Sequence, residues 1–255
     1  MKELDYLIEY LINEDENLSN IEIPNDINGK KDLYRALRNI REPKSISSEY
    51  LKVQDKYLKD EINKKGITDE KDIKFDYDII SIWQGDITTL KCDAIVNACN
   101  KYLLGCFTPN HKCIDNEIHS YAGMQLRNEC NDIMKGKTLP NGEVVLTNGY
   151  NLPCKYIFET VGPEINGKVS DKDIEELKKC YVNSLKLMIK NNLKTIAFPC
   201  ISTGVFSFPN DLACKIAIST VKDFIKNTDY KFDHIIFNVF KDIDKSLYER
   251  ELNNE

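Results

Sequence analysis

Short β-rich runs alternate with long amphipathic helices from about residue 73 onwards, and this alternation constrains the fold more than any other feature of the sequence. Apolar residues recur at helical spacing along 118–133 and 174–188, and a third such helix opens at Pro209. Strands and helices that alternate in this way predict a three-layer α/β/α domain around a mixed, largely parallel sheet. Ligands bind such sheets beyond the carboxyl ends of the strands. The predicted strands are 79–83, 94–98, 144–147, 156–161, 195–199 and 234–239.

The N-terminal part of the chain has a different pattern and carries no cluster of catalytic residue types. Apolar residues recur at helical spacing within 4–11, 33–40 and 51–62, with no β-rich run between them. We therefore divide the chain into a helical N-terminal extension, residues 1–72, and an α/β domain, residues 73–255. The charged faces of these stretches suit either a packing brace or a partner surface, and we favour the brace because each stretch has an apolar stripe to bury.

Composition and charge argue against several classes of protein for this chain of 255 residues. The formal net charge of −6 and the pI near 5.3 do not suit general nucleic-acid binding, which needs Lys and Arg clustered against phosphates. No apolar run approaches membrane-spanning length and the acidic N-terminus lacks the apolar stretch of a signal peptide, so we expect a cytoplasmic protein with no membrane partner. The nine cysteines are an odd number in a chain of this size, and we expect reduced thiols.

The segment 105–115 places two thiols and one histidine in a short loop. Pro109 prevents a continuous helix here. Cys106 can then fold back towards His111 and Cys113, which are two residues apart. Thiolate and imidazole are ligands that zinc prefers, and three protein ligands leave one tetrahedral position for water or substrate, as in catalytic zinc sites. The spacing leaves a second interpretation open, in which unligated thiols pack beside a surface imidazole, and a fourth ligand could come from another cysteine.

Small and polar residues collect where four of the predicted strands end. Glycine beside Ser or Thr at a strand-to-helix junction offers backbone N–H groups without an intervening side chain, and such groups can hold a diphosphate without any positive charge. Four such segments in one domain predict a nucleotide site, even in an acidic protein. The segments are 84–88, 97–100, 160–163 and 201–206.

These segments, in this order, resemble the macrodomain family over roughly two-thirds of the chain, from about residue 76 to 240. The run of glycines that most macrodomains carry is replaced by the loop from Cys106 to Cys113, which resembles zinc-containing bacterial macrodomains with a helical N-terminal extension. The resemblance implies a protein-ADP-ribose hydrolase that holds Zn2+ through Cys106, His111 and Cys113. The motifs that carry the resemblance are Gly85-Asp86-Ile87-Thr88, Asp93 to Asn100, Tyr156 to Pro163 and Ser202-Thr203-Gly204-Val205-Phe206.

The same resemblance implies a role for each matching residue. Asp86 would accept the adenine amino group, with the backbone of Ile87 beside it. The segment 202–206 would wrap the diphosphate and the distal ribose of ADP-ribose. Asn100 would donate a hydrogen bond to the distal ribose, and Asp115 would activate water or orient the ribose, so these two are the predicted catalytic residues.

Each of these residues also has a structural alternative that the sequence leaves open. Asp86 and Asp115 could be helix N-caps, and Asn100 could cap a turn after its strand. The segment 202–206 could be an ordinary glycine-containing turn that buries Phe206. We expect His119, inside the 118–133 helix, to be a packed core imidazole and not a fourth zinc ligand.

The predicted function is therefore zinc-dependent removal of mono-ADP-ribose from modified protein side chains, with release of ADP-ribose. Two alternatives share the same pocket: a non-catalytic reader of ADP-ribose with a structural zinc, and an O-acetyl-ADP-ribose deacetylase. The sequence does not determine the target protein or whether the linkage is an ester to Asp or Glu or a bond to Ser or Arg. By resemblance, the expected partners are a lipoyl-carrier protein as substrate and a sirtuin-type ADP-ribosyltransferase.

Overall fold

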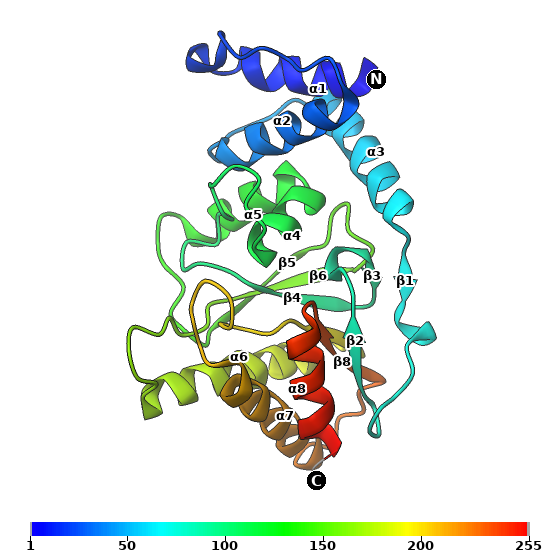
Figure 1. Ribbon diagram of the computed structural model, residues 1–255, viewed down its shortest axis with the longest axis vertical. Coiled ribbons are helices and arrows are strands. Elements are labelled where there is room, and N and C mark those ends of the chain that lie inside the picture. Colours follow the sequence, from blue (N-terminus) through cyan, green and yellow to red (C-terminus); the bar gives the residue numbers. More distant parts are fainter. Residues whose placement is uncertain (1, 254–255) are drawn as a thin grey trace.

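The computed structural model describes residues 2–253 and has an elongated shape, with the N-terminal helices at one end (Figure 1). Residue 1 of the predicted extension and residues 254–255 of the predicted α/β domain lie outside the described residues. The helices are α1 (Lys2–Asn13), α2 (Ile27–Ile40), α3 (Ser48–Lys65), α4 (Ile114–Ala122), α5 (Met124–Met134), α6 (Asp171–Lys190), α7 (Asn210–Lys226) and α8 (Asp242–Asn253). The strands are β1 (Thr68–Asp69), β2 (Ile80–Gln84), β3 (Leu90–Lys91), β4 (Ala94–Ala98), β5 (Val144–Asn148), β6 (Tyr156–Thr160), β7 (Thr195–Phe198) and β8 (His234–Val239).

A six-stranded sheet forms the centre of the second domain, in the order β2-β8-β7-β4-β6-β5. All neighbouring strands are parallel except β5, which pairs antiparallel with β6. The prediction of a mixed, largely parallel sheet is confirmed, and all six predicted strands are present with ends that move by at most one residue. Because the other five strands run the same way, the loops that follow β2, β4, β7 and β8 lie at one edge of the sheet.

Helices cover both faces of the sheet, which confirms the three-layer prediction (Figure 1). α6, α7 and α8 pack on one face, where Tyr181, Phe198 and Phe237 are fully buried in a large apolar core. α4 and α5 pack on the other face around Ile118 and Leu126. Each such side chain contributes about 1.5–3 kcal/mol relative to an exposed one, so the two cores hold the sheet edge in place.

The N-terminal extension lies against α4 and α5, on the side away from the sheet (Figure 1). Its core contains fully buried Leu7, Tyr34 and Tyr50, and Met124 of α5 belongs to the same apolar cluster. Nη1 of the buried Arg127 in α5 donates to the backbone carbonyls of Arg38 and Asn39, at 2.9 and 3.0 Å. These carbonyls at the C-terminal end of α2 have no partners within their own helix. Apolar and polar contacts thus join the extension to the second domain, as expected of a brace.

Three predicted features of the chain are wrong in detail. The single helix expected over 118–133 is broken at Gly123, whose φ of 103° lies outside the range of helical residues, so α4 and α5 are separate. The extension is not helical to residue 72, because Thr68–Asp69 pairs with Leu90–Lys91 as a two-residue strand. The helix expected to open at Pro209 begins one residue later, with Pro209 as its N-cap.

No helix within residues 2–253 combines the length and the apolar character needed to cross a membrane.

Candidate functional site

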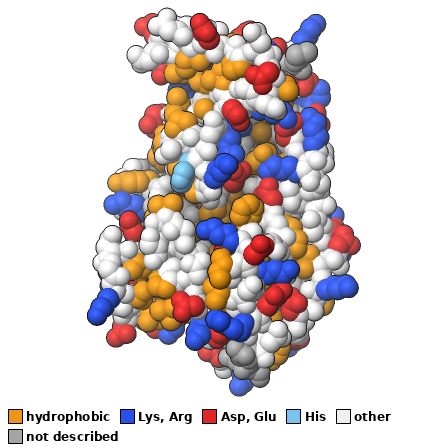
Figure 2. Space-filling model, viewed as in Figure 1, with side chains coloured by type: hydrophobic (Ala, Val, Ile, Leu, Met, Phe, Trp, Pro, Cys, Tyr) orange, Lys and Arg blue, Asp and Glu red, His pale blue; other side chains and the backbone are white. Residues whose placement is uncertain are grey.

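A cleft of about 1630 Å³ opens at the carboxyl ends of the strands, between the sheet and the loop before α4. Figure 2 shows apolar side chains within a hollow at mid-height, with charged side chains of both signs around it. Every residue predicted from the sequence as a site residue lines this cleft. These residues are Asp86, Ile87, Asn100, Cys106, His111, Cys113, Asp115, Ser202, Thr203, Gly204, Val205 and Phe206.

Asp86 lies at one end of the cleft, immediately after β2. Its Oδ1 accepts hydrogen bonds from the N–H of Thr88, at 2.9 Å, and from Thr88 Oγ1, at 2.6 Å. The N-cap alternative is therefore confirmed for the short 3-10 helix 87–89. Burial alone would raise the pKa of Asp86, but hydrogen bonds from Lys65 and Thr88 lower it below its usual value. The N–H of Ile87 has no acceptor among residues 2–253, so it can bind a ligand.

The segment 202–206 also lines the cleft, after β7. Ser202 has a φ of 64°, in the left-handed region, and its buried hydroxyl has no hydrogen-bond partner within the described chain. The loop closes on itself through Phe208 N–H to Ser202 O, at 3.0 Å, and Ser207 N–H to Gly204 O, at 3.1 Å. The three consecutive amides of residues 204–206 have no acceptor among the described residues. Consecutive free amides form an anion-binding concavity, which is what a diphosphate requires.

Two glycines shape this part of the cleft: one allows close packing, and the other leaves open space. A Cβ on Gly162 would lie 2.1 Å from Ser202 Oγ, so a side chain there would displace the 202–206 segment. A Cβ on Gly204 would meet nothing within 4 Å and would extend into the cleft. Phe206 is half-buried and packs against the α4–α5 core. The alternative in which a turn buries Phe206 is therefore correct in part, because the side chain is only partly buried. Gly162 belonged to a predicted segment but had no predicted role.

Asn100 and Asp115 lie together where the cleft passes the N-terminus of α4. Lys65, the ion-pair partner of Asp86, instead contacts Tyr121, which is six residues after Asp115 in the same helix and so about 9 Å further along its axis. Asn100 Nδ2 donates to Asp115 Oδ2, at 3.3 Å, and Asn97 Nδ2 donates to Asp115 Oδ1, at 2.9 Å. Asn100 Oδ1 also accepts the N–H of Tyr102 at 3.0 Å, so its turn-capping alternative is confirmed as well. Burial raises the pKa of Asp115 to about 6, although the amide donors oppose the shift. Asp115 is therefore mostly ionised at neutral pH and can accept a proton.

The N-cap alternative for Asp115 is wrong, because α4 begins with Cys113 as its N-cap. The thiol of Cys113 accepts the N–H of Asn116 at 3.4 Å. Burial raises the pKa of the Cys113 thiol to about 12, with the Asn116 hydrogen bond acting in the opposite direction. Asp115 occupies the first turn, where its carboxylate also benefits from the helix dipole.

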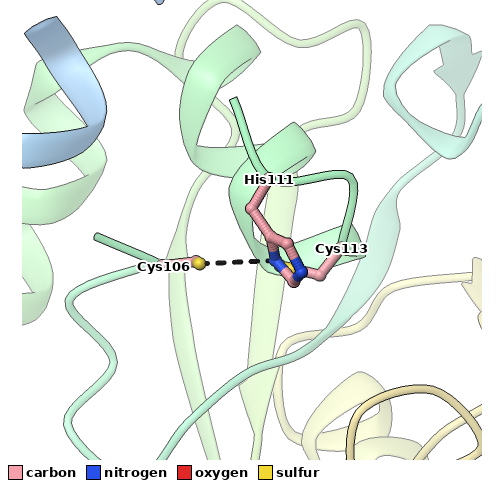
Figure 3. Close-up of side chains that lie close together, drawn as sticks. All are labelled: Cys106, His111 and Cys113. Atoms are coloured by element: carbon pink, nitrogen blue, oxygen red, sulfur yellow. Dashed lines mark hydrogen bonds between the residues drawn. The ribbon is translucent and has the colours of Figure 1, made fainter. Parts of the chain in front are cut away.

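Cys106, His111 and Cys113 converge on one point, as Figure 3 shows. One ligand atom from each lies within 4.8 Å of the others, and Cys106 Sγ is 3.5 Å from His111 Nδ1. Zn–S and Zn–N bonds of about 2.3 and 2.0 Å separate the ligand atoms of a tetrahedral site by about 3.5–3.8 Å. The donor set and the Cys106–His111 spacing therefore fit zinc. All three side chains are half-buried and line the cleft, so a fourth coordination position could face a ligand.

The extension holds this loop through two residues, Arg35 and Asn39, that were not predicted as site residues. Arg35 of α2 donates to the carbonyl of His111, at 3.0 Å, and to Asn116 Oδ1, at 2.7 Å. Asn39 Oδ1 accepts the N–H of Asn110 at 2.9 Å. A surface arginine in a charged helix resembles many others in a sequence, so only the packing of α2 against the loop identifies its role.

A buried group of polar side chains lies behind Asp115. Glu159 of β6 accepts from Asn97 Nδ2 at 2.9 Å, and one Asn97 amide therefore bridges Asp115 and Glu159. Burial and the nearby Asp115 carboxylate raise the pKa of Glu159 to about 8. His119 is buried as expected, and burial lowers its pKa well below its usual value, yet neither ring nitrogen has a hydrogen-bond partner within residues 2–253.

Comparisons with known proteins agree with this arrangement. Residues 96–217 match the family model described as Macro domain. A protein-ADP-ribose hydrolase of Treponema medium is 45% identical over 254 residues, which cover 96% of this chain and 96% of that protein. A protein-ADP-ribose hydrolase of Staphylococcus aureus (strain MRSA252) is 46% identical and covers 99% and 96%, respectively. The crystal structure of the Trypanosoma brucei macrodomain in complex with ADP-ribose matches with a TM-score of 0.66 and 28% identity, over 84% of this chain and 94% of that one.

Proposed function

Since this chain belongs to the macrodomain family, and to its protein-ADP-ribose hydrolases, we propose that it is a zinc-dependent enzyme that removes mono-ADP-ribose from modified protein side chains. The hydrolase activity rests on relatives of that name that match over nearly the whole chain. One observation of the structure supports the proposal most: a single cleft holds an adenine-type acceptor at Asp86, free amides at 204–206 and an ionised, buried Asp115.

ADP-ribose binds with its adenine amino group at Asp86 and its diphosphate on the amides of residues 204–206. The distal ribose then lies against Asn100 and Asp115, where the cleft passes the N-terminus of α4. Binding energy from the adenosine and the diphosphate positions the bond to be broken, although neither group takes part in the reaction.

Cys106, His111 and Cys113 would hold the zinc ion beside the distal ribose. When bound, zinc supplies Lewis-acid chemistry, and its larger effect is to orient and polarise the ribose, because two thiolate ligands weaken its power to acidify water. Asp115 accepts a proton from the attacking water while Asn97 and Asn100 fix the orientation of its carboxylate. The water oxygen bonds to the ribose carbon as the bond between that carbon and the protein side chain breaks, and the proton accepted by Asp115 passes to the departing side chain.

The activity is tested by incubating mono-ADP-ribosylated protein with the wild type and with Cys113→Ala, and by measuring released ADP-ribose and zinc content in both. We expect turnover by the wild type and loss of both zinc and activity in the variant. Tight ADP-ribose binding without turnover, on acidic-residue and serine linkages alike, would instead indicate a reader. Release of acetate from O-acetyl-ADP-ribose without action on protein would indicate the deacetylase.

We also propose a lipoyl-carrier protein as substrate, a sirtuin-type ADP-ribosyltransferase as the enzyme that modifies it, and a cytoplasmic location. Sequence resemblance supports the two partners, and the nine free cysteines suit a reducing compartment. A carrier protein ADP-ribosylated by such a transferase is the substrate to test first. Turnover faster than on an unrelated ADP-ribosylated protein would support the choice.

A further inference from the structure

The helical extension contributes a charged side chain to the nucleotide end of the cleft. Lys65 is the last residue of α3, and Gly66, with a φ of 90°, is the C-cap of this helix. Its Nζ lies 2.6 Å from Asp86 Oδ2 and 3.5 Å from the centroid of the Tyr121 ring. The Lys65 side chain is 28% exposed, and Lys65, Asp86 and Tyr121 all line the cleft. An ion pair and an aromatic ring thus hold this ammonium group in one position.

The contacts of Asp86 leave it little remaining acceptor capacity. A carboxylate offers about four lone-pair sites. The N–H and the hydroxyl of Thr88 occupy two of them on Oδ1, and Lys65 occupies one on Oδ2. About one site therefore remains, on Oδ2. That oxygen is fixed in direction because Thr88 holds one side of the carboxylate and Lys65 the other.

We propose that Lys65 is a positioning residue that sets base specificity, by leaving Asp86 a single, oriented acceptor for one N–H of an exocyclic amino group. The proposal rests on the binding of ADP-ribose at this cleft, argued above. A 6-aminopurine supplies the required donor. A 6-oxopurine presents an oxygen atom at the same place, and the carboxylate repels it. The extension thereby takes part in ligand recognition in addition to bracing the second domain.

The adjacent residue provides a matched control. Lys64 carries the same charge on the same helix turn, but its side chain is 68% exposed and its partner is Glu61, at 2.7 Å. Lys64 does not line the cleft. Replacing either lysine by methionine removes one charge and keeps an unbranched helix-forming side chain. A difference between the two variants therefore reports the contact with Asp86.

The test measures dissociation constants by calorimetry for ADP-ribose and for its inosine analogue, with wild type, Lys65→Met, Lys65→Arg and Lys64→Met. We expect Lys65→Met to weaken ADP-ribose binding about fivefold to tenfold and to lower the ADP-ribose-to-inosine preference by a similar factor. Lys65→Arg should restore most of the preference, and Lys64→Met should match the wild type.

Two results would overturn the assignment of Lys65. One is an unchanged preference in Lys65→Met, including equal weakening of both ligands. The other is a larger loss for the inosine analogue, because it would mean direct contact between Lys65 and the base oxygen. Thermal unfolding of each variant shows whether equal weakening reflects misfolding. If the wild type does not bind ADP-ribose at all, the proposed function itself fails.

Discussion

The two ends of the cleft are built in different ways. At the nucleotide end, Asp86 takes its hydrogen bonds from Thr88, two residues later, and from one lysine of the extension. At the catalytic end, Asp115 is 5% exposed and is held by Asn97 and Asn100 of a different element. The first end is a local turn that recognises a ligand, whereas the second keeps a carboxylate in a buried, preorganised environment. Recognition here relies on a partly exposed carboxylate, while catalysis depends on a buried one.

The largest effect is expected at the catalytic end, from Asp115→Ala. Loss of a general base costs about 10²–10⁴-fold in rate, and kcat should fall by that order while ADP-ribose binding changes by only a few-fold. Single-turnover release of ADP-ribose, together with calorimetry, separates the two quantities. A kcat for Asp115→Ala within threefold of the wild type would show that Asp115 is not the general base, and that the two ends of the cleft do not separate binding from catalysis.

Asp86→Ala should have the opposite effect to Asp115→Ala: ADP-ribose binding should weaken while kcat stays nearly unchanged. It removes the acceptor for the amino group and also leaves Lys65 without its partner, so affinity for ADP-ribose should fall about tenfold to a hundredfold. At saturating substrate kcat should change little, because Asp86 is remote from the bond that breaks. A kcat that falls as much as the affinity would mean that the ends act as one unit.

Arg35→Ala tests whether the extension holds the catalytic end in place. It removes the hydrogen bonds to His111 O and Asn116 Oδ1, so the Cys–His loop should lose preorganisation and zinc affinity should fall about tenfold. Competition with a chromogenic chelator measures the zinc affinity of each variant. Lys31→Ala is the matched control, since Lys31 lies on the same helix but pairs with Glu61. Equal zinc affinity in both variants would argue against this role for the extension.

The smallest effect concerns stability and pH. The pKa of Glu159 is about 8 in the folded protein, whereas an unfolded glutamate has a pKa of about 4.3. Between these values the native state binds one more proton than the unfolded state, so the unfolding free energy should fall as pH rises, by at most ~1.4 kcal/mol per pH unit. Glu159→Gln should flatten this slope. Urea unfolding between pH 7 and 8 measures this slope, above the pKa of about 6 of Asp115. Equal slopes in Glu159→Gln and the wild type would contradict the protonated state of Glu159.

The sequence predicted most of the fold and those parts of the site that lie close together along the chain. Strand and helix periodicity predicted the sheet, and the spacing of Cys106, His111 and Cys113 predicted three ligands in one loop. The break between α4 and α5 was missed, because the apolar stripe continues through Gly123 and only its φ of 103° interrupts the helix. Lys65 and Arg35 were missed because their partners lie 21 or more residues away.

The sequence by itself determined which chemical groups are available: an acceptor at one strand end, a glycine-containing segment at another, and two thiols with an imidazole. These follow from local spacing, since neighbouring residues cannot be far apart. Only the tertiary structure decided which groups face each other. The parallel register of β4 and β6 sets Asn97 beside Glu159, and the packing of the extension brings Lys65 to Asp86. Burial then sets the pKa of Asp115 and Glu159, because the dielectric environment depends on all the chain segments that surround a group.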